Sequence, residues 1–398
     1  MRNFRNIREI SLSPHPGLNF FLGKNGQGKT SLLEALGILS TFKSFRGSRP
    51  HEFIHNEALQ LDLNATLSYE DRDGETWETR LDLSMNRLST QDHHLSKVAK
   101  INQKTFKRTT DYLAQKLEMP GLGFHTVVFN PADHELVRGE PKLRRSYLNQ
   151  AISAHSLSYL ESLKRYERCL CQRNALLKRL YRPENLPQSS FEEYTSQLIS
   201  NGAQLVWERL NWMSGMQRKL DKILPEISDG ITNLVFFYGS PWLFSGGKTL
   251  DFAGQFEVPS IENIKESFRD FLSQNRSDEL YQQVTIAGPH RDDWGFKISG
   301  SPLKSQGSQG EVRSALLALK LSESELYQER TRTKPVFLLD DFSSELDEER
   351  REMLLGYMRK LNLQTFVTTT DLQFKSLHSY QLQNGKILSF QQELPLTV

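Results

Sequence analysis

The sequence predicts an α/β fold in which one core domain is assembled from both ends of the chain and carries an antiparallel β subdomain and an inserted helical arm. An apolar run, a glycine-rich turn and a helical pattern stand near the N-terminus, and a second buried strand follows roughly 300 residues later. Between them the hydrophobic spacing changes from period two to a helical period. We therefore divide the chain into an N-terminal half of the core domain (1–150), the inserted arm (151–280) and a C-terminal half (281–398).

The first element is the segment 23–30, Gly-Lys-Asn-Gly-Gln-Gly-Lys-Thr, which fits the P-loop pattern G-x-x-x-x-G-K-[ST]. An apolar run at 18–22 predicts a strand before it, and residues 30–36 predict a helix after it. Lys29 is expected to reach the β- and γ-phosphates of ATP, and the Thr30 hydroxyl to ligate Mg²⁺. A glycine-rich turn that binds nothing is the alternative. The expected phosphate-binding residues are Gly23, Lys24, Asn25, Gly26, Gln27, Gly28, Lys29, Thr30 and Ser31.

The composition fits a globular chain of 398 residues with a formal net charge of +2, which by itself implies no polyanionic partner. Its two cysteines, Cys169 and Cys171, point to opposite sides of a predicted helix, so we expect reduced thiols. Neither a signal peptide nor a membrane span is predicted. These features favour a cytoplasmic protein without a membrane partner.

The middle of the chain predicts strands and then long helices. Alternating residues at 59–84 and 97–107 indicate antiparallel strands, with a turn at 71–74. Apolar residues at helical spacing over 156–180 and 191–224 predict two helices joined by a tip that contains Pro183 and Pro187. They form either a projecting arm or two ordinary bundle helices. Further strands are expected at 283–288 and 294–298, and a helix at 311–330; residues 228–280 give no clear pattern.

A second nucleotide-binding element is the apolar run 335–339, which ends on Asp340 and Asp341. This is a Walker B pattern, a buried strand that ends where ligands bind in α/β sheets. Asp340 is expected to hold Mg²⁺ opposite Thr30, so the expected metal-binding residues are Thr30 and Asp340. Asp341 would orient or deprotonate the attacking water.

A third element is Ser308-Gln309-Gly310-Glu311, which stands at the start of the helix at 311–330. Taken alone it is an ordinary helix N-cap or a second anion site. Followed by Asp340 and the segment 343–347, it looks like an ABC-type signature motif with its D-loop. In that class the signature of one subunit closes on the γ-phosphate held by another, which predicts an ATP-dependent homodimer. The expected catalytic residues are Asp341, Lys29 and Ser308, and Ser308 and Gly310 join the nucleotide-binding set.

These motifs, together with Gly-Pro-His-Arg-Asp-Asp at 288–293 and Phe-Asn-Pro-Ala-Asp at 129–133, resemble the bacterial RecF family of recombination-repair ATPases, which is related to SMC-type heads. The resemblance spans the whole chain and is weakest at 228–280. It implies an ABC-type, SMC-like ATPase head that binds ATP, dimerises on it and binds duplex and gapped DNA. It further implies action with RecO and RecR to load RecA in recombinational repair, replication and the SOS response, with weak, DNA-stimulated ATP hydrolysis as a switch.

Three positions depart from the general ABC pattern. Asp341 stands in place of Glu, Thr370 in place of the switch His, and Glu311 in place of Gln. The first two departures predict slow turnover. Asn130 is the candidate for the Q-loop position and completes the expected nucleotide-binding set with Asp340.

The expected DNA-binding residues are Arg46, Arg144, Arg145, Lys164 and Arg165. Residues 141–182 contain ten Lys or Arg against two Glu, Arg173 among them. Solvated helix charges are the alternative, and Arg144 and Arg145 could instead be structural. Since no base-reading motif is present, binding should be independent of sequence. His290 is expected to be structural or at a dimer contact rather than catalytic.

Two other classes of ATPase fit the P-loop. One is a transporter ATPase subunit, which the basic arm and the departures at Asp341 and Thr370 argue against. The other is an overcoming-lysogenization-type ATPase, which would need an acidic metal cluster in a further C-terminal domain. About 50 residues follow Asp347, too few for that domain.

Overall fold

A computed structural model describes residues 1–70, 75–90, 94–118, 124–180, 188–228, 233–244, 249–254, 257–342, 348–371 and 378–391. The chain divides into two compact units. Unit 1 comprises Met1–Asp133, Glu226–Ser228 and Glu323–Val398, and unit 2 comprises His134–Pro225 and Asp229–Ser322. Both ends of the chain thus meet in unit 1. The segments 134–150 and 281–322 group with the long helices, so the units differ from the domains expected to divide at 150 and 280.

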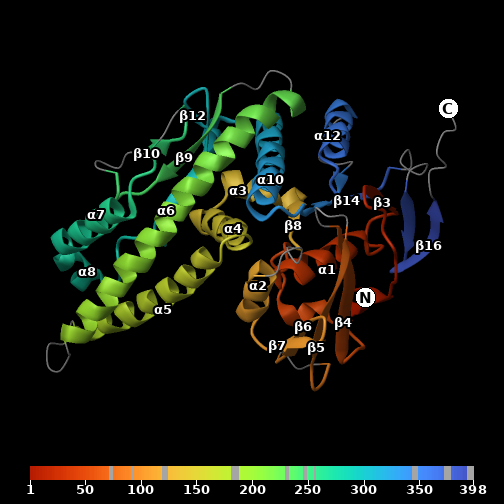
Figure 1. Ribbon diagram of the computed structural model, residues 1–398, viewed down its shortest axis with the longest axis horizontal. Helices are drawn as coiled ribbons and strands as arrows, with labels where there is room; N and C mark the ends of the chain where they lie inside the picture. The colour runs from red at the N-terminus through yellow and green to blue at the C-terminus, as the bar shows by residue number, and fades with distance from the viewer. Residues whose placement is uncertain are drawn as a thin grey trace. The chain divides into compact units, whose positions relative to one another are not determined.

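A six-stranded, mainly parallel sheet is the centre of unit 1, with the strand order β16-β15-β3-β14-β13-β8. The red strand β3 from the N-terminal part of the chain lies between strands β15 and β14 from its blue C-terminal part (Figure 1). The strands β3, β14, β13 and β8 are parallel, so their carboxyl ends lie at one edge. The bounds are β3 Leu18–Leu22, β8 Thr126–Phe129, β13 Val336–Leu339, β14 Thr365–Thr369, β15 Ser379–Gln383 and β16 Lys386–Gln391, with helices α1 Lys29–Thr41 and α12 Glu348–Leu361. The strands and helix expected around the P-loop and Walker B motifs are confirmed.

The second sheet of unit 1 is antiparallel, with the order β2-β1-β4-β5-β6-β7. Its bounds are β1 Arg2–Phe4, β2 Ile7–Glu9, β4 Gln60–Glu70, β5 Thr76–Asn86, β6 Ser96–Ile101 and β7 Lys104–Phe106, with α2 Thr109–Glu118 beside it. The register pairs Leu61 with Met85 and Leu63 with Leu83, and all four side chains are buried. Every second residue therefore faces the core, and the predicted β subdomain is confirmed.

Unit 2 contains the two long helices, α5 (Leu157–Leu180) and α6 (Gln188–Ile227). They run antiparallel, because α5 residues early in the helix bond late α6 residues: Tyr159 meets Arg209, whereas Arg173 meets Thr195. Their expected apolar stripe is buried at Tyr166, Leu177, Val206, Leu210 and Met213. The other elements are α3 His134–Arg138, α4 Pro141–Ser153, α7 Ile261–Gln274, α8 Arg276–Gln282 and α9 Leu303–Gln306, and a sheet of β10 Thr249–Asp251, β9 Leu234–Gly239, β11 Asp293–Ile298 and β12 Ser301–Pro302. Helix α10 (Gln309–Thr331) begins in unit 2 and ends in unit 1.

The strand expected at 283–288 is wrong, because this segment is irregular. The backbone N–H of Thr285 donates to Asn174 Oδ1 at 2.8 Å, and that of Ile286 donates to Glu279 Oε1 at 3.3 Å. Side chains thus take the donors that a strand ladder would use. The expected turn at 71–74, Pro183, Pro187 and the D-loop at 343–347 lie outside the described residues.

Candidate nucleotide site

The P-loop runs from the end of β3 into the first turn of α1. At two of its positions, steric constraints require glycine. Gly28 has φ 103° and precedes the helix directly. Gly23 lies so close to the neighbouring strand that a Cβ would stand 2.5 Å from the Leu382 carbonyl oxygen. A side chain at either position would deform the loop. The local sequence therefore fixes the shape of the loop as the motif predicts.

Lys29 lies within the loop, the position from which a P-loop lysine meets phosphate. Its Nζ donates to the carbonyl oxygen of Gly23 at 2.5 Å and to that of Lys24 at 3.0 Å. Burial lowers the pKa of Lys29, and the charges of Asp341 and Asp340 oppose that change. An anion held in the loop would further stabilise the ammonium ion.

The loop is also held from outside, by contacts that the sequence did not indicate. Asn6 Nδ2 donates to the Gly26 carbonyl oxygen at 3.0 Å, and Asn6 Oδ1 accepts from Ser31 at 3.1 Å. Gln27 Oε1 accepts the backbone N–H of Asn384 at 2.6 Å, and Gly385 N–H donates to the Gln27 carbonyl oxygen at 3.1 Å. The turns β1–β2 and β15–β16 therefore both brace the loop.

Asp340 follows β13 and lies beside the P-loop, although 310 residues separate it from Thr30. Its Oδ1 accepts from Thr30 Oγ1 at 2.9 Å and from Thr368 Oγ1 at 2.7 Å. Strand β14 lies between β3 and β13, which places Thr368 at this point. Thr368 is a site residue that the sequence analysis missed. The run Thr368-Thr369-Thr370 was its only signal, and Thr370 was chosen there by analogy with the switch position.

Asp341 lies two residues beyond the end of β13 and has φ 55°, an uncommon conformation for a residue other than glycine. Its backbone N–H donates to Thr368 Oγ1 at 2.8 Å. The Thr368 hydroxyl therefore links the carboxylate of Asp340 to the backbone of Asp341. Such strained backbone geometry is common at functional sites.

The oxygens of Thr30 and Asp340 fit a magnesium ion. Hydroxyl and carboxylate oxygens are hard ligands, and Mg²⁺ usually takes only one or two carboxylates together with phosphate and water. Burial raises the pKa of Asp340, the hydrogen bonds from Thr368 and Thr30 lower it, and the charge of Asp341 raises it further. A cation beside this buried carboxyl group would favour its ionised form.

A cavity of about 1050 Å³ opens over the loop within unit 1. Its lining includes the P-loop, Asp340, Asp341 and Thr368, together with Arg5 and Arg46. Glu34, which is fully buried, accepts two hydrogen bonds from Arg5 at 2.9 and 2.6 Å and pairs with Arg46 at 3.6 Å. Arg46 therefore lies at the nucleotide cavity, and its role on DNA stays a prediction.

Ser308 is the N-cap of α10 in unit 2 and forms a capping box with Glu311. Glu311 N–H donates to Ser308 Oγ at 3.2 Å, and Ser308 N–H donates to Glu311 Oε2 at 2.7 Å. These hydrogen bonds lower the pKa of Glu311. Ser308 is exposed and Gly310 half-buried. The interpretation of Ser308 as a helix N-cap is thus confirmed. A role of Ser308 and Gly310 in a signature motif stays a prediction.

Asn130 closes a turn at the end of β8. Its Oδ1 accepts from Ala132 N–H at 2.9 Å, and its own N–H donates to Asp133 Oδ2 at 2.9 Å. The next residue, Pro131, lines the cavity. A Q-loop role for Asn130 stays a prediction.

Arg144, which was expected to contact DNA, and Arg173 of the basic segment 141–182 are both buried. Arg144 is 3% exposed and forms two hydrogen bonds of 2.7 Å with Asp293, so we correct its assignment to a structural one. Arg173 is fully buried against Glu279. His290 is also structural, because Tyr166 and Thr285 bind both of its ring nitrogens.

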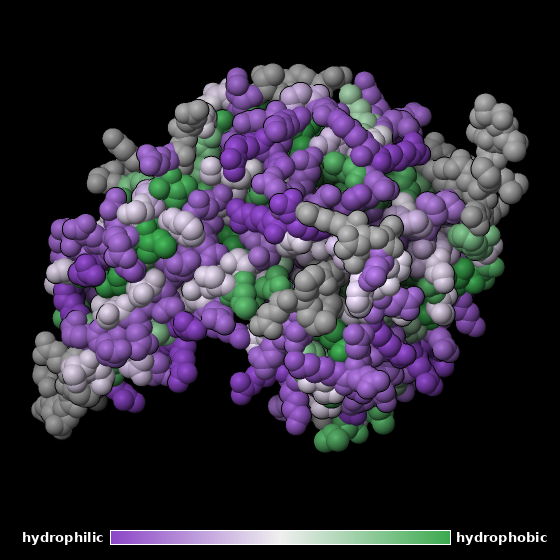
Figure 2. Space-filling view, in the orientation of Figure 1, coloured by the Kyte–Doolittle hydropathy of each residue, from purple (hydrophilic) through white to green (hydrophobic). Residues whose placement is uncertain are grey.

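Other basic residues remain accessible. Lys164 and Arg165 are exposed on α5, where Arg165 pairs with Glu161 at 3.1 Å. Figure 2 shows mostly hydrophilic side chains where Figure 1 draws this helix. Among the described residues, no helix combines the length and apolar character needed to cross a bilayer.

Known proteins resemble this chain over nearly its full length. The RecF/RecN/SMC N terminal domain family matches residues 1–383. The "DNA replication and repair protein RecF" of Geotalea daltonii is 33% identical over 394 residues, covering 98% of each chain. That of Streptococcus gordonii is 32% identical, covering 97% of this chain and 98% of the relative.

Solved structures of RecF and of an SMC head are also similar to this chain. A structure described as "the recombination mediator protein RecF-ATP in RecFOR pathway" has a TM-score of 0.81 and 30% identity, covering 98% of this chain and 95% of the other. An SMC head structure with a TM-score of 0.51 and 14% identity, covering 100% and 96%, shares the fold. The sequence-based assignment to an SMC-like head is thereby confirmed, and the chain belongs to the RecF family.

Proposed function

We propose that this protein binds MgATP, dimerises when it does so, and acts on DNA as a recombination mediator in replication and repair. Relatives named for DNA replication and repair, and a related structure described with ATP in the RecFOR pathway, support this proposal. The observation that carries it is the contact of Thr30 with Asp340, which joins a P-loop to a Walker B carboxylate across 310 residues. RecO and RecR are the expected partners, RecA is the indirect one, and the cytoplasm is the expected location.

The nucleotide part of the proposal rests on the chemistry of the cavity. The P-loop supplies backbone N–H groups and Lys29 for the phosphates, and Thr30 and Asp340 supply oxygens for Mg²⁺. Asp341 would position the attacking water, with Ser308 of a second copy at the γ-phosphate. The short carboxylate of Asp341 supports a turnover below the roughly 10 s⁻¹ typical of enzymes.

The dimer part rests on Ser308. This residue stands exposed at the start of α10, where the backbone N–H groups of a helix N-terminus favour an anion. The serine hydroxyl caps its own helix, and it can also donate its hydrogen to a phosphate oxygen. ATP held in one copy would then bind to this helix end in the other.

The DNA part rests on cations that solvent can reach. Arg145 is half-buried, and Lys164 and Arg165 are exposed. Each phosphate contact adds affinity that falls with salt and carries no sequence information. The expected substrate is therefore duplex or gapped DNA of any sequence.

Sedimentation velocity tests the dimer. Wild type, Ser308→Arg and the matched control Ser305→Arg, which adds the same charge three residues earlier, are compared with and without ATP and gapped DNA. We expect ATP-dependent dimers of the wild type and the control, and monomers of Ser308→Arg. Because the substitution also removes an N-cap worth about 1 kcal/mol, Ser308→Ala controls for the cap alone.

Two results would contradict the proposal. Normal dimerisation of Ser308→Arg would exclude a site in which Ser308 meets ATP of another copy. Failure of the wild type to bind ATP, with Lys29→Ala as the negative control, would exclude the nucleotide function itself.

A further inference from the structure

The loop 288–293 of unit 2, with sequence Gly-Pro-His-Arg-Asp-Asp, contains a group that the nucleotide site does not use. Arg291 is exposed on this loop, and Arg145 of α4 lies against it, its Nη1 donating to the Asp292 carbonyl oxygen at 2.9 Å. Within the described part of the chain, neither guanidinium forms an ion pair with a carboxylate. The surroundings of the loop explain what these two cations can do.

The loop is held rigidly. Gly288 has φ 123°, and a Cβ there would lie 2.4 Å from the Tyr166 hydroxyl oxygen. Tyr166 donates that hydroxyl to His290 Nδ1 at 2.6 Å, and His290 Nε2 donates to the Thr285 carbonyl oxygen at 3.1 Å. Burial lowers the pKa of His290 to about 4, so the ring is neutral near pH 7 and contributes no charge.

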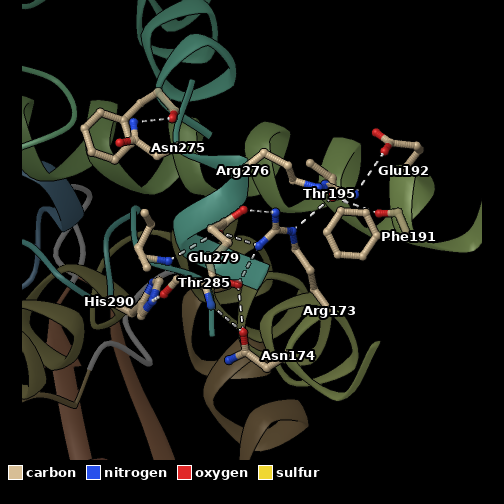
Figure 3. A network of polar contacts seen from close by, with 12 residues as sticks. Arg173, Asn174, Phe191, Glu192, Thr195, Asn275, Arg276, Glu279, Thr285 and His290 are labelled. Carbon is tan, nitrogen blue, oxygen red and sulfur yellow. Dashed lines mark hydrogen bonds and ion pairs between the residues drawn. The ribbon is translucent and has the colours of Figure 1, made fainter. Parts of the chain in front are cut away.

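His290 is hydrogen-bonded to Thr285, which belongs to a buried polar network (Figure 3). Thr285 accepts from Arg173 Nη1 at 2.8 Å and donates to Asn174 Oδ1 at 2.8 Å. Arg173 in turn pairs with Glu279 at 2.6 Å, with both side chains fully buried. Residues from α5 and α8 thus fix the loop, and little ordering cost would remain when a ligand binds.

The acidic residues of the loop are already engaged. Asp293 is held by both arms of Arg144, and Asp292 accepts from the Tyr238 hydroxyl at 2.7 Å and Trp242 Nε1 at 2.8 Å. Burial raises the pKa of Asp292 to about 6. Neither carboxylate is therefore available to neutralise Arg145 or Arg291 fully.

A count of the charges around the loop also shows an excess of positive charge. The four arginines around the loop, Arg144, Arg145, Arg209 and Arg291, face the two acids Asp292 and Asp293, which leaves two positive charges in excess. Burial, and then the nearby Arg209, lower the pKa of Arg145. A positive group in such surroundings favours an anion.

We propose that Arg145 and Arg291 form a preorganised site for phosphodiester groups of the DNA backbone. Guanidinium groups present paired N–H donors that match phosphate oxygens. The polyanion is favoured over a single small anion because α5, the helix whose Tyr166 holds the loop, also carries the exposed cations Lys164, Arg165 and Arg168, which a long polyanion could contact and a small anion could not. The site deepens the DNA-binding part of the proposed function and rests on it.

Salt-dependent DNA binding tests the site. Binding of a fluorescent duplex in the presence of MgATP is measured between 50 and 200 mM KCl for wild type and Arg145→Gln/Arg291→Gln. We expect affinity to fall at least tenfold at the lowest salt and the slope of log K against log salt to fall by about two, near 0.9 for each lost contact. The matched control is Arg269→Gln, an exposed arginine on α7 of the same unit, which should change neither quantity.

A measurement on the wild type avoids any effect of substitution on folding. Phenylglyoxal modifies accessible arginines, and mass spectrometry should show that duplex DNA protects Arg145 and Arg291 while Arg269 stays reactive. Protection by inorganic phosphate but not by duplex would replace the DNA site with a small-anion site. Protection by MgATP alone would instead indicate a contact between copies.

The outcomes separate this site from the proposed function. Wild type that binds duplex, with an unchanged salt slope in the double variant, would refute the site and leave the function standing. Wild type that binds no duplex under any condition would refute both.

Discussion

The buried ion pair between Arg173 and Glu279 makes a contribution to the free energy of unfolding that a double-mutant cycle can measure. Both side chains are fully buried, and their two hydrogen bonds measure 2.8 and 2.6 Å. Removing one partner of such a pair leaves a buried charge without compensation and typically costs about 3–5 kcal/mol. Replacing both partners by apolar residues removes that penalty.

The structure favours a small cost for the double replacement. The Thr195 hydroxyl keeps its bond to the Phe191 carbonyl oxygen, and the Thr285 hydroxyl keeps its bond to Asn174. Among the described residues, only the N–H of Ile286, which donates to Glu279 at 3.3 Å, loses an acceptor. We expect Arg173→Met and Glu279→Leu to cost about 3–5 kcal/mol each and the double variant less than either.

The assay is guanidinium chloride unfolding followed by tryptophan fluorescence. Four of the five tryptophans, Trp207, Trp212, Trp242 and Trp294, lie in unit 2, so the signal mainly reports the unit that contains the pair. The control cycle uses Arg165→Met and Glu161→Leu, an exposed pair on the same helix, where each change should cost less than about 1 kcal/mol. Additive costs in the Arg173–Glu279 cycle would refute the reasoning, because they would mean that neither charge depends on the other.

Three further predictions concern unit 1. Thr368→Val removes the hydroxyl that joins Asp340 to Asp341 and should raise the Mg²⁺ concentration needed for half-maximal ATP turnover about 10- to 100-fold; an unchanged Mg²⁺ titration would contradict this role. Gln27→Ala removes the side-chain acceptor for Asn384 N–H and should weaken ATP binding up to about tenfold in a fluorescent-nucleotide titration. The control Asn384→Ala keeps the backbone donor and should leave ATP binding unchanged. Equal losses of affinity in the two variants would show that this hydrogen bond does not support the loop. Burial lowers the pKa of Lys116 from 10.5 to about 7, so as pH rises the native state loses this proton before the unfolded state does. Between pH 7 and 9 the free energy of unfolding of the wild type should therefore rise by about 2–3 kcal/mol, and that of Lys116→Met should not show this rise. Parallel unfolding curves of the two proteins at both pH values would show that Lys116 is not the titrating group.

Local patterns in the sequence were enough to predict most elements of the fold. The P-loop, the β4–β5 hairpin, the two long helices and the strand before Asp340 all depend on spacing within a few residues, and the structure contains them. The failure at 283–288 has the same origin, because an apolar run cannot show that Asn174 and Glu279 bind its backbone. The units also group differently from the expected domains, since packing joins segments that spacing treats separately.

The candidate site likewise has features that could be predicted from the sequence and others that could not. The sequence by itself determined that a phosphate loop and a Walker B carboxylate are present, because glycines, Lys29 and a buried strand ending in Asp340 are local features. Only the tertiary structure decided that Thr368 joins them, that Gln27 is braced by a turn some 350 residues away, and that Arg144 and Arg173 are buried while Arg291 is exposed. The physical reason is that a charged side chain looks the same in any sequence, whereas its role depends on which distant groups desolvate it and which carboxylates it meets.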